Sequence, residues 1–508
     1  MENKNFLLAV LLSVSFLIIW SIFVVPRFTP KPALVVPPAV TSLSAPLSSS
    51  ASGMVSSMQA PVQTVDVELH VGDSDLLLTS LGGGVKHWWL HLKGQDIDLV
   101  NHPESGIWPL SLYPNLPYKV AVKGPQAQWE ATGPQGIRIT KILKLSDHGF
   151  LHDYTIHFQN PTGKPIELKD WEWGWGPGVG TAITEQKENP RLVRAISFSG
   201  FKVDKHKEGD YPAAGLWMGI DNRYFLVVAV PDATDHPLLH VTGSKDQTQV
   251  TFRNTTVVPA HSEAMFHYYF YAGPKGYTHL KTYGLNLEHA VDFGMFSSLG
   301  RWMLRAVYYL KRLTGNYGWA IVLLTIVLQI LLLPLTLKSF KSMMAMKTLQ
   351  PKIAELQKKF KDDPKRLNVE MMNMYKNTGT NPFGGCLPML LQMPIFWALF
   401  TAVRNAYELR GAPFIWWIHD LSVADPYHVF PIAVGLGMFV QQRMSGAVTD
   451  PTQKQMMFLM PVMMTVMFFN FPAALTLYWF TQSMLNMSFQ FAFRKYTESS
   501  KPQTALIH

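Results

Sequence analysis

The 508-residue chain contains a single cysteine, Cys386. One thiol excludes an internal disulfide framework and a cysteine-based zinc site, so a domain outside the cytoplasm would be held by its apolar core alone. The usual catalytic spacings are also missing, because the chain has no phosphate-binding loop, no His-Glu-x-x-His and no nucleophile elbow. Cys386 has no nearby histidine to activate it. These absences argue against an enzyme, and no cofactor or metal is expected.

Charged residues are also scarce, at 16% of the chain, and their signs are unbalanced: 44 Lys and Arg against 35 Asp and Glu give a formal net charge of +9. The basic residues are spread along the chain and are not gathered with aromatic side chains that could stack on bases, so direct nucleic-acid binding is not expected. An anionic lipid bilayer accounts better for the excess. The 48% hydrophobic content predicts a protein that is part membrane and part aqueous.

Residues 6–25 form an uncharged run of 20 residues, which is long enough to cross a hydrocarbon core of about 30 Å. A cleaved signal peptide is the competing interpretation, but Val24-Val-Pro-Arg27 is not a cleavage site of small residues. We therefore predict a membrane anchor over residues 1–26. Residues 27–63 are rich in Pro, Ser and Ala with little charge, which predicts a flexible linker.

Short alternating runs such as Val65-Asp-Val-Glu-Leu-His-Val71, broken by Gly, Pro, Asn and Asp, predict a large extracytoplasmic all-β sandwich over residues 64–290. Its tryptophans are expected to form the core in preference to stacking on sugars. The prominent ones are Trp88, Trp89, Trp108, Trp129, Trp171, Trp173, Trp175 and Trp217. A metal at His87 and His91, or glycosidase chemistry at Glu172, is an alternative that the strand pattern does not favour.

Residues 291–314 predict an amphipathic helix lying in the membrane interface, with a helix facing the β core as the alternative. Arg301, Arg305 and Arg312 fall on the face opposite to an apolar stripe. The predicted stripe is Phe296, Leu299, Met303, Ala306, Leu310 and Leu313.

The segment 315–495 is organised around the apolar run 317–337, which carries one amide, Gln329, near its middle. Hydrophobic spans are expected at about 317–337, 386–407, 427–442, 456–470 and 473–492, with a break at Asn470-Phe-Pro472. Together with residues 6–25 they make six spans.

Residues 338–380 predict a helical hairpin outside the bilayer. Asp362-Asp-Pro364 supplies a turn with an N-cap and a proline at the start of the second helix. The six methionines of the hairpin suit either a surface for varied apolar partners or an ordinary helix seam. The hairpin, the 443–455 loop and the C-terminal end with Arg494, Lys495 and Lys501 carry basic residues, so the positive-inside rule predicts cytoplasmic termini, a cytoplasmic tail over 496–508 and a periplasmic β domain.

Polar residues inside the spans are the main candidates for function. Thr325 and Gln329 lie one helical turn apart, and Tyr478, Gln482 and Asn486 share one stripe of the last span, with Gln392 and Gln490 also within spans. Such groups face either one another or a water-filled cavity. Hydrogen bonding between helices and a hydrated groove are both open at this point.

Several motifs, in order along the chain, closely resemble the YidC membrane-protein insertase family of Gram-negative bacteria. They are Leu81-Gly-Gly-Gly-Val85, Gly315-Asn-Tyr-Gly-Trp319, Pro334-Leu-Thr336, Leu349-Gln-Pro-Lys352, Asn381-Pro-Phe-Gly-Gly-Cys-Leu-Pro388, Gln392-Met-Pro-Ile-Phe396, Trp417-Ile-His-Asp-Leu421, Thr449-Asp-Pro451 and Met460-Pro461. The resemblance implies a polytopic α-helical membrane protein with a five-helix insertase core and a periplasmic β-supersandwich. It also implies a chaperone of the inner membrane that inserts nascent membrane proteins, alone or with the Sec translocon, and makes a ribosome or a targeting receptor a candidate partner of the hairpin.

The resemblance also assigns roles to residues. Thr325 matches a groove-lining threonine, and Tyr478 and Trp479 match an aromatic pair of the last span. Gln392 and Gln482 are added to this groove because they are polar within spans, whereas the apolar slide for clients matches Met393 and Phe396, with Met467 assigned to it. The family's groove arginine falls on Gln329, so this chain lacks that fixed positive charge.

Two other functions are weighed against an insertase. A small-solute transporter with an outer glycan-binding domain would need a site at the bilayer midplane and usually internal repeats of spans, and no repeat relates 317–407 to 427–492. A polysaccharide-processing enzyme would need a pair of catalytic carboxylates in the β domain.

Overall fold

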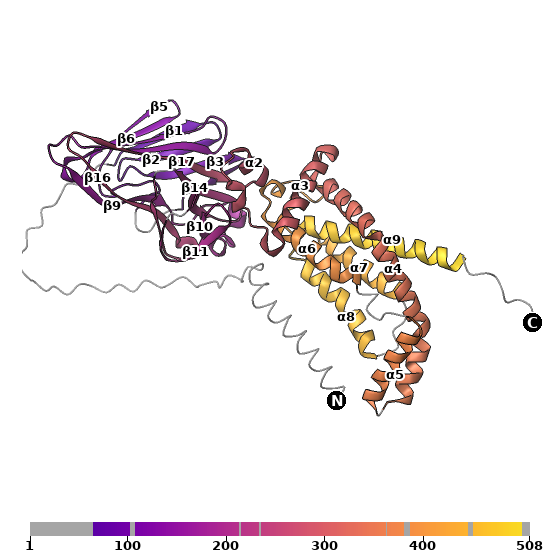
Figure 1. The fold of residues 1–508 in the computed structure, drawn as a ribbon. Helices are drawn as coiled ribbons and strands as arrows, with labels where there is room; N and C mark the ends of the chain where they lie inside the picture. Colours follow the sequence, from indigo (N-terminus) through magenta and orange to yellow (C-terminus); the bar gives the residue numbers. More distant parts are fainter. Residues whose placement is uncertain are drawn as a thin grey trace, which may run out of the picture. The chain divides into compact units, whose positions relative to one another are not determined.

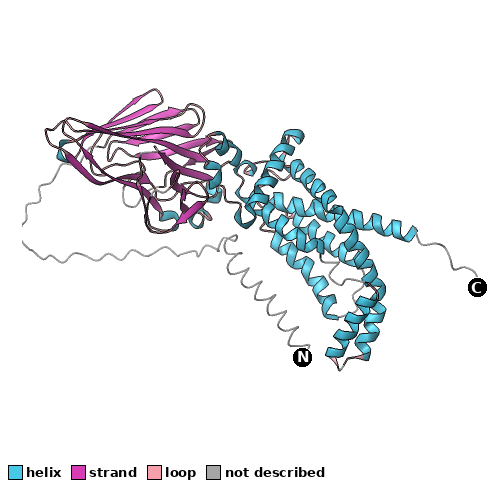
Figure 2. Ribbon diagram, viewed as in Figure 1, coloured by secondary structure: helices cyan, strands magenta, loops and turns pink. Residues whose placement is uncertain are grey.

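A computed structural model describes residues 64–101, 107–212, 215–232, 235–361, 363–379, 387–445 and 451–499. The predicted span 6–25, the linker 27–63, Cys386 and the end of the tail lie outside the described residues. The chain divides into two compact units, one ending at Ala290 and the other starting at Val291. Strands fill the first unit and long helices the second (Figures 1 and 2).

The described strands of the first unit lie in three sheets, and every pairing between strands is antiparallel. The first sheet has the order β1 (Asp66–Val71), β2 (Ser74–Thr79), β3 (Val85–Leu92), β4 (Gln95–Asp98). The second has the order β11 (Val203–His206), β10 (Arg194–Phe198), β13 (Trp217–Asp221), β14 (Phe225–Pro231), β17 (Glu263–Pro274), β8 (Leu151–Gln159), β7 (Arg138–Lys144), β6 (Gln126–Thr132), β5 (Lys119–Lys123). The third has the order β12 (Gly209–Tyr211), β15 (Leu238–Thr242), β16 (Gln249–Val258), β9 (Ile166–Trp175). The all-β prediction is confirmed.

Tryptophan forms much of the core between these sheets. The fully buried indoles are those of Trp88, Trp129, Trp171, Trp173, Trp175 and Trp217. Each removes roughly 200 Å² from water, which is worth about 5 kcal/mol at about 25 cal/mol per Å². The core interpretation of the tryptophans is confirmed for these six, whereas Trp89 is only half-buried. Glu172 is held by Arg253, whose Nη2 lies 3.1 Å from a carboxylate oxygen.

A buried lysine explains the glycine run that follows β2. Lys141 of β7 is fully buried, and its Nζ donates to the carbonyls of Gly82, Gly83 and Leu110 at 3.2, 2.6 and 2.8 Å. A Cβ on Gly83 would lie 2.8 Å from the lysine Cε, and the residue has a φ of +62°. A side chain larger than hydrogen is therefore excluded there. Burial lowers the pKa of Lys141 well below its usual range.

The first unit ends in the short helix α2 (Tyr277–Thr282). The helices of the second unit are α3 (Ser297–Thr314), α4 (Tyr317–Lys359), α5 (Pro364–Asn377), α6 (Leu387–Asn405), α7 (Val429–Ser445), α8 (Pro451–Phe468) and α9 (Ala473–Ser499). The predicted break between the last two spans is confirmed, since α8 ends at Phe468 and α9 begins at Ala473. The N-cap of the hairpin's second helix is also confirmed: Asp363 accepts a hydrogen bond from the amide of Arg366, and Pro364 opens α5.

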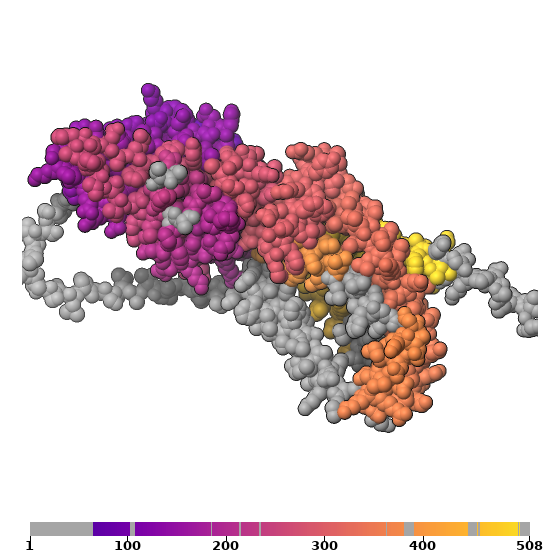
Figure 3. All heavy atoms as spheres, in the orientation of Figure 1, coloured from indigo at the N-terminus to yellow at the C-terminus, as the bar shows by residue number. Residues whose placement is uncertain are grey.

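The predicted span 317–337 and the first arm of the predicted hairpin belong to one helix. α4 is one helix of 43 residues that runs through Pro334 and Pro351 without ending. Proline lacks an amide proton and disfavours a helix interior, yet α4 remains helical on both sides of each proline. α5 lies beside the far end of α4, where both are seen as orange spheres in Figure 3.

The face of α3 that is buried in the protein differs from the predicted apolar stripe. The buried face consists of Gly300, Met303, Leu304 and Val307, and it packs against α4 and α6. Of the predicted stripe only Met303 belongs to it, and Leu313 is 66% exposed. The buried face turns away from the predicted stripe because two neighbouring helices, and not one flat surface, cover α3.

Measured by length and apolar composition, α4 is the one helix in the described ranges that can cross a membrane by itself, and Phe458–Phe468 is a shorter apolar helix. The span count of six stays a prediction. Large apolar side chains nevertheless point outward from three helices, a surface that hydrocarbon favours and water does not. Examples are Ile330 and Leu331 of α4, Ile432 and Leu436 of α7, and Phe458 and Val466 of α8.

Two side chains fix the turns at one end of the helices. Asn316 caps α4 by accepting hydrogen bonds from the amides of Gly318 and Trp319, and its Nδ2 donates to the carbonyl of Pro413 at 3.0 Å. Asp425 is 1% exposed and accepts from the Trp417 indole at 3.0 Å and from the amide of Phe430, next to the start of α7. Two of the sequence motifs, 315–319 and 417–421, thus contain residues that cap a helix or hold a turn through hydrogen bonds.

The buried His152 predicts acid sensitivity of the β domain. Its Nδ1 accepts a hydrogen bond from the amide of Ser146, and burial lowers its pKa to about 3 from 6.5. Below pH 6.5 the unfolded chain binds a proton that the folded chain rejects, so stability falls as the pH falls from 6.5 towards 3. We expect a loss of about 2 kcal/mol between pH 7 and 5 from this group.

The measurement is denaturant unfolding of the β domain in the full chain at several pH values, followed by tryptophan fluorescence. His152→Asn, which keeps an acceptor, should flatten the pH dependence by that amount. His70 is exposed and its pKa is raised by Asp75, so His70→Asn is the control and should not flatten it. Equal slopes for wild type and His152→Asn would contradict the assignment.

Candidate functional site

Polar side chains of the helical unit meet along one face of α9. Tyr478, Gln482, Asn486 and Gln490 follow one another at intervals of four residues, so they form a single row, here called the α9 polar row. Tyr478 and Gln490 are buried, whereas Gln482 and Asn486 are part-exposed. Two neighbouring helices supply the partners described below.

Gln329 of α4 pairs with the C-terminal half of this row. Its Nε2 donates to Oδ1 of Asn486 at 2.5 Å, and Gln329 is 4% exposed. The sequence alone left two explanations for this amide, a hydrogen bond between helices and a wet groove. The structure places Gln329 in a hydrogen bond between α4 and α9.

Gln392 of α6 pairs with the other end of the row. Its Nε2 donates to the hydroxyl of Tyr478 and, at 3.2 Å, to Oε1 of Gln482. Gln392 is 9% exposed. Side chains on one face of α9 thus make hydrogen bonds to an amide of α4 and to an amide of α6. All the groups in these hydrogen bonds are neutral.

Thr325 does not join these pairs. Its Oγ1 donates to the carbonyl of Ile321 in its own helix at 2.7 Å, and the side chain is 1% exposed. Trp479 is part-exposed and stands edge-on to the ring of Phe396, with ring centres 5.2 Å apart. It also lies 5.3 Å from Phe468. Trp479 therefore belongs to an aromatic cluster between α6, α8 and α9.

The residues predicted as an apolar slide are in different environments. Met393 is 41% exposed on α6, and Met467 is part-exposed on α8. Phe396 is buried beneath Trp479 and is not on the surface. A client moving along the outside of these helices would meet the methionines before the phenylalanine.

Asn486 was absent from the predicted groove, although it directly contacts Gln329. The signal was present in the sequence, because residues 478, 482 and 486 are spaced for one helical face. Spacing identifies the face but not the partner helix. The pairing of Gln329 on α4 with Asn486 on α9 depends on where the two helices cross.

Comparison with known proteins follows from this geometry. The family model "60Kd inner membrane protein" matches residues 309–501, and the model "YidC periplasmic domain" matches residues 124–306. "Membrane protein insertase YidC" of Endomicrobium trichonymphae is 42% identical over 446 residues, covering 82% of this chain and 83% of the relative. The protein of the same name from Syntrophus aciditrophicus (strain SB) is 32% identical and covers 97% of this chain and 99% of the relative.

Among solved structures, "Active YidC insertase crystal structure with the first transmembrane domain resolved" matches 84% of this chain and 93% of its own. The sequence identity is 18% and the TM-score 0.39. The superposition is loose, and the relationship rests on the sequence relatives.

The Gln329–Asn486 hydrogen bond predicts coupled stabilities. Gln329→Leu or Asn486→Leu alone leaves an amide without its partner inside the helical unit, whereas the double substitution removes both groups. We expect a coupling free energy of about 0.6 to 2 kcal/mol in a double-mutant cycle of unfolding in mixed detergent micelles.

Ser488→Ala is the matched control for the partner on α9. Ser488 is exposed, and its Oγ donates to the carbonyl of Met484 in the same helix. The change in unfolding free energy caused by Ser488→Ala should therefore add to that caused by Gln329→Leu without a coupling term. Strict additivity of Gln329→Leu with Asn486→Leu would contradict the pairing.

Proposed function

The chain belongs to the YidC family of membrane protein insertases, and we propose that its α9 polar row, with Gln329 and Gln392, is the polar floor of a groove through which clients enter the bilayer. The family is non-enzymatic, and its members are inner-membrane proteins with a periplasmic domain. The substrates are nascent membrane proteins. Family membership favours the insertase over the transporter and the polysaccharide-processing enzyme.

The observation that carries the proposal is the collection of neutral polar groups on one face of α9. An amide without a partner in an apolar medium costs roughly 4 to 8 kcal/mol, so a polar client segment needs hydrogen-bonding groups at membrane depth. Gln482 and Asn486 are part-exposed and can offer donors and acceptors to a client. Gln329 and Gln392 hold these side chains in place when no client is bound.

The energy for insertion comes from the client. About 20 apolar residues at about −0.5 kcal/mol each yield about −10 kcal/mol on transfer into lipid. The groove lowers the barrier for the short polar segment that must cross first. Exposed Met393 and part-exposed Met467 offer an apolar wall beside the polar floor.

Several finer features belong to the same proposal. The basic hairpin and tail argue for cytoplasmic termini and several membrane crossings by the positive-inside rule, which leaves the β domain in the periplasm. The Sec translocon is the proposed partner for large clients. The hairpin of α4 and α5 is the proposed docking site for a ribosome or a targeting receptor, and Val369 and Met372 give α5 exposed apolar side chains for such a contact.

Substitutions of Gln329 test the groove. Gln329→Leu should impair the insertion of clients with polar outer tails, because it removes a donor and frees Asn486. Gln329→Arg should be tolerated, since a guanidinium can still donate to Oδ1 of Asn486. The measurement is client insertion and growth in cells depleted of their own insertase, with crosslinking from position 482 to a nascent chain.

A pair of clients that differ only in the charge of the outer tail sharpens the test. Wild type should insert acidic and basic tails about equally, whereas Gln329→Arg should prefer the acidic tail, because Coulomb attraction at contact distance is worth about a few kcal/mol at intermediate dielectric. Ile330→Leu, on the exposed side of α4, is the control and should behave as wild type. Normal insertion and normal crosslinking by Gln329→Leu would refute the role of this residue.

A further inference from the structure

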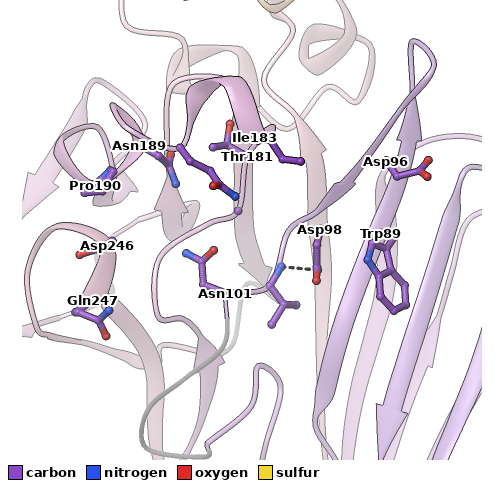
Figure 4. Close-up of a pocket in the computed structure, with 13 residues that line it drawn as sticks. Trp89, Asp96, Asp98, Asn101, Thr181, Ile183, Asn189, Pro190, Asp246 and Gln247 are labelled. Carbon is purple, nitrogen blue, oxygen red and sulfur yellow. Dashed lines mark hydrogen bonds between the residues drawn. The ribbon is translucent and has the colours of Figure 1, made fainter. Parts of the chain in front are cut away.

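The β domain contains a pocket that is not part of the proposed groove. It has a volume of about 490 Å³, within the range of small-molecule sites. The pocket lies where the β3–β4 hairpin, the segment 180–190 and the turn η6 (Lys245–Gln247) meet (Figure 4). Its mouth is open to solvent, because Ile183 at the rim is 84% exposed.

Some of the residues that line the pocket are held in place by hydrogen bonds within the protein. Oδ1 of Asp98 accepts hydrogen bonds from the amides of Trp88 and Val100 at 3.1 and 3.0 Å, and Oδ2 lies 2.5 Å from Nδ1 of His87. Asn189 is buried, and its Nδ2 donates to the carbonyl of Val179 at 2.8 Å. These contacts hold the β4 strand and the segment 180–190 in place without any ligand.

Other polar groups of the lining are uncommitted. Among the described residues, the side-chain amides of Asn101, Gln186 and Gln247 make no hydrogen bond, and neither does the carboxylate of Asp246. They come from three segments that line the same pocket, since Asp246 and Gln247 share the turn η6, and Asn101, Asp246 and Gln247 are labelled in Figure 4. Each amide offers both donors and an acceptor, so together they can bind a ligand that carries several hydroxyl groups.

An aromatic ring completes the lining. Trp89 stacks on His87, with ring centres 4.4 Å apart and an interplanar angle of 7°. Because Asp98 fixes His87, the indole is held in one orientation. Trp89 is the tryptophan of β3 that is not fully buried, and it is one of the residues that line the pocket. A rigid indole beside planar polar groups suits the C–H face of a sugar ring.

Charge narrows the ligand class. The thirteen described lining residues include three aspartates and no lysine or arginine, which disfavours an anion. Asp98 is paired with His87 and Asp96 with His91, and the hydrogen bonds of His91 to Asp96 and Asp75 raise the pKa of His91. Two of the three carboxylates thus already have a histidine partner, which favours a neutral ligand over a cation. We propose that this pocket binds a neutral saccharide through Trp89, Asn101 and Gln247.

The test uses the full chain in lipid nanodiscs, because maltoside detergents carry a neutral disaccharide head group. D-glucose, D-galactose, N-acetylglucosamine and maltose are the probes, measured by saturation-transfer difference NMR and titration. At least one should bind, with the strongest transfer to its C–H protons. Trp89→Ala should abolish the transfer, and Asn101→Ala or Gln247→Ala should weaken binding by roughly five- to tenfold.

Phe201→Ala is the matched control, since Phe201 is 95% exposed, aromatic, and outside the pocket lining. It should bind as wild type does. Gln247→Ala changes an exposed side chain and keeps the proposal testable if Trp89→Ala misfolds, as judged by thermal melting. Absence of binding for all four sugars, or binding unchanged in Trp89→Ala and Gln247→Ala, would overturn the proposal. All pocket variants should insert clients normally, so this result is independent of the groove.

Discussion

Hydrocarbon permits few unpaired polar groups, and this constraint organises the helical unit. α9 resolves it with one face on which four polar side chains follow one another, and α4 and α6 each contribute an amide that pairs with this face. Large apolar side chains point outward from α4, α7 and α8. The same groups therefore join the helices and line the proposed groove, so in that proposal stability and function draw on one set of hydrogen bonds.

The β domain meets a different constraint, because the chain has one cysteine and no disulfide can support the domain. It relies on buried indoles and on polar groups that are buried with their partners. Lys141 is the clearest case: three carbonyls surround its Nζ, and the glycines beside it leave the room that the lysine needs. Such a site fixes the loop after β2 more firmly than apolar contacts would.

Much of this architecture could be predicted from local patterns. Alternation predicted the strands, the Asn470-Phe-Pro472 break separated α8 from α9, and Asp363 with Pro364 marked the start of α5. The failures arose where tertiary contacts decide. Composition could not show that α4 continues through Pro334, periodicity could not show which face of α3 two helices would cover, and spacing could not select Asn486 as the partner of Gln329. The pocket beside Trp89 joins three distant segments, which no local pattern reveals.

The neutral pairing of Gln329 with Asn486 has an electrical consequence. A fixed cation at membrane depth would feel the transmembrane potential, worth about 2.3 kcal/mol per 100 mV for a charge that crosses the whole field. An amide pair carries no net charge and does not titrate near neutral pH. The floor of the proposed groove is thus insensitive to voltage and to pH at this pair, so an effect of the proton-motive force on insertion would act through other charges, those of the client included.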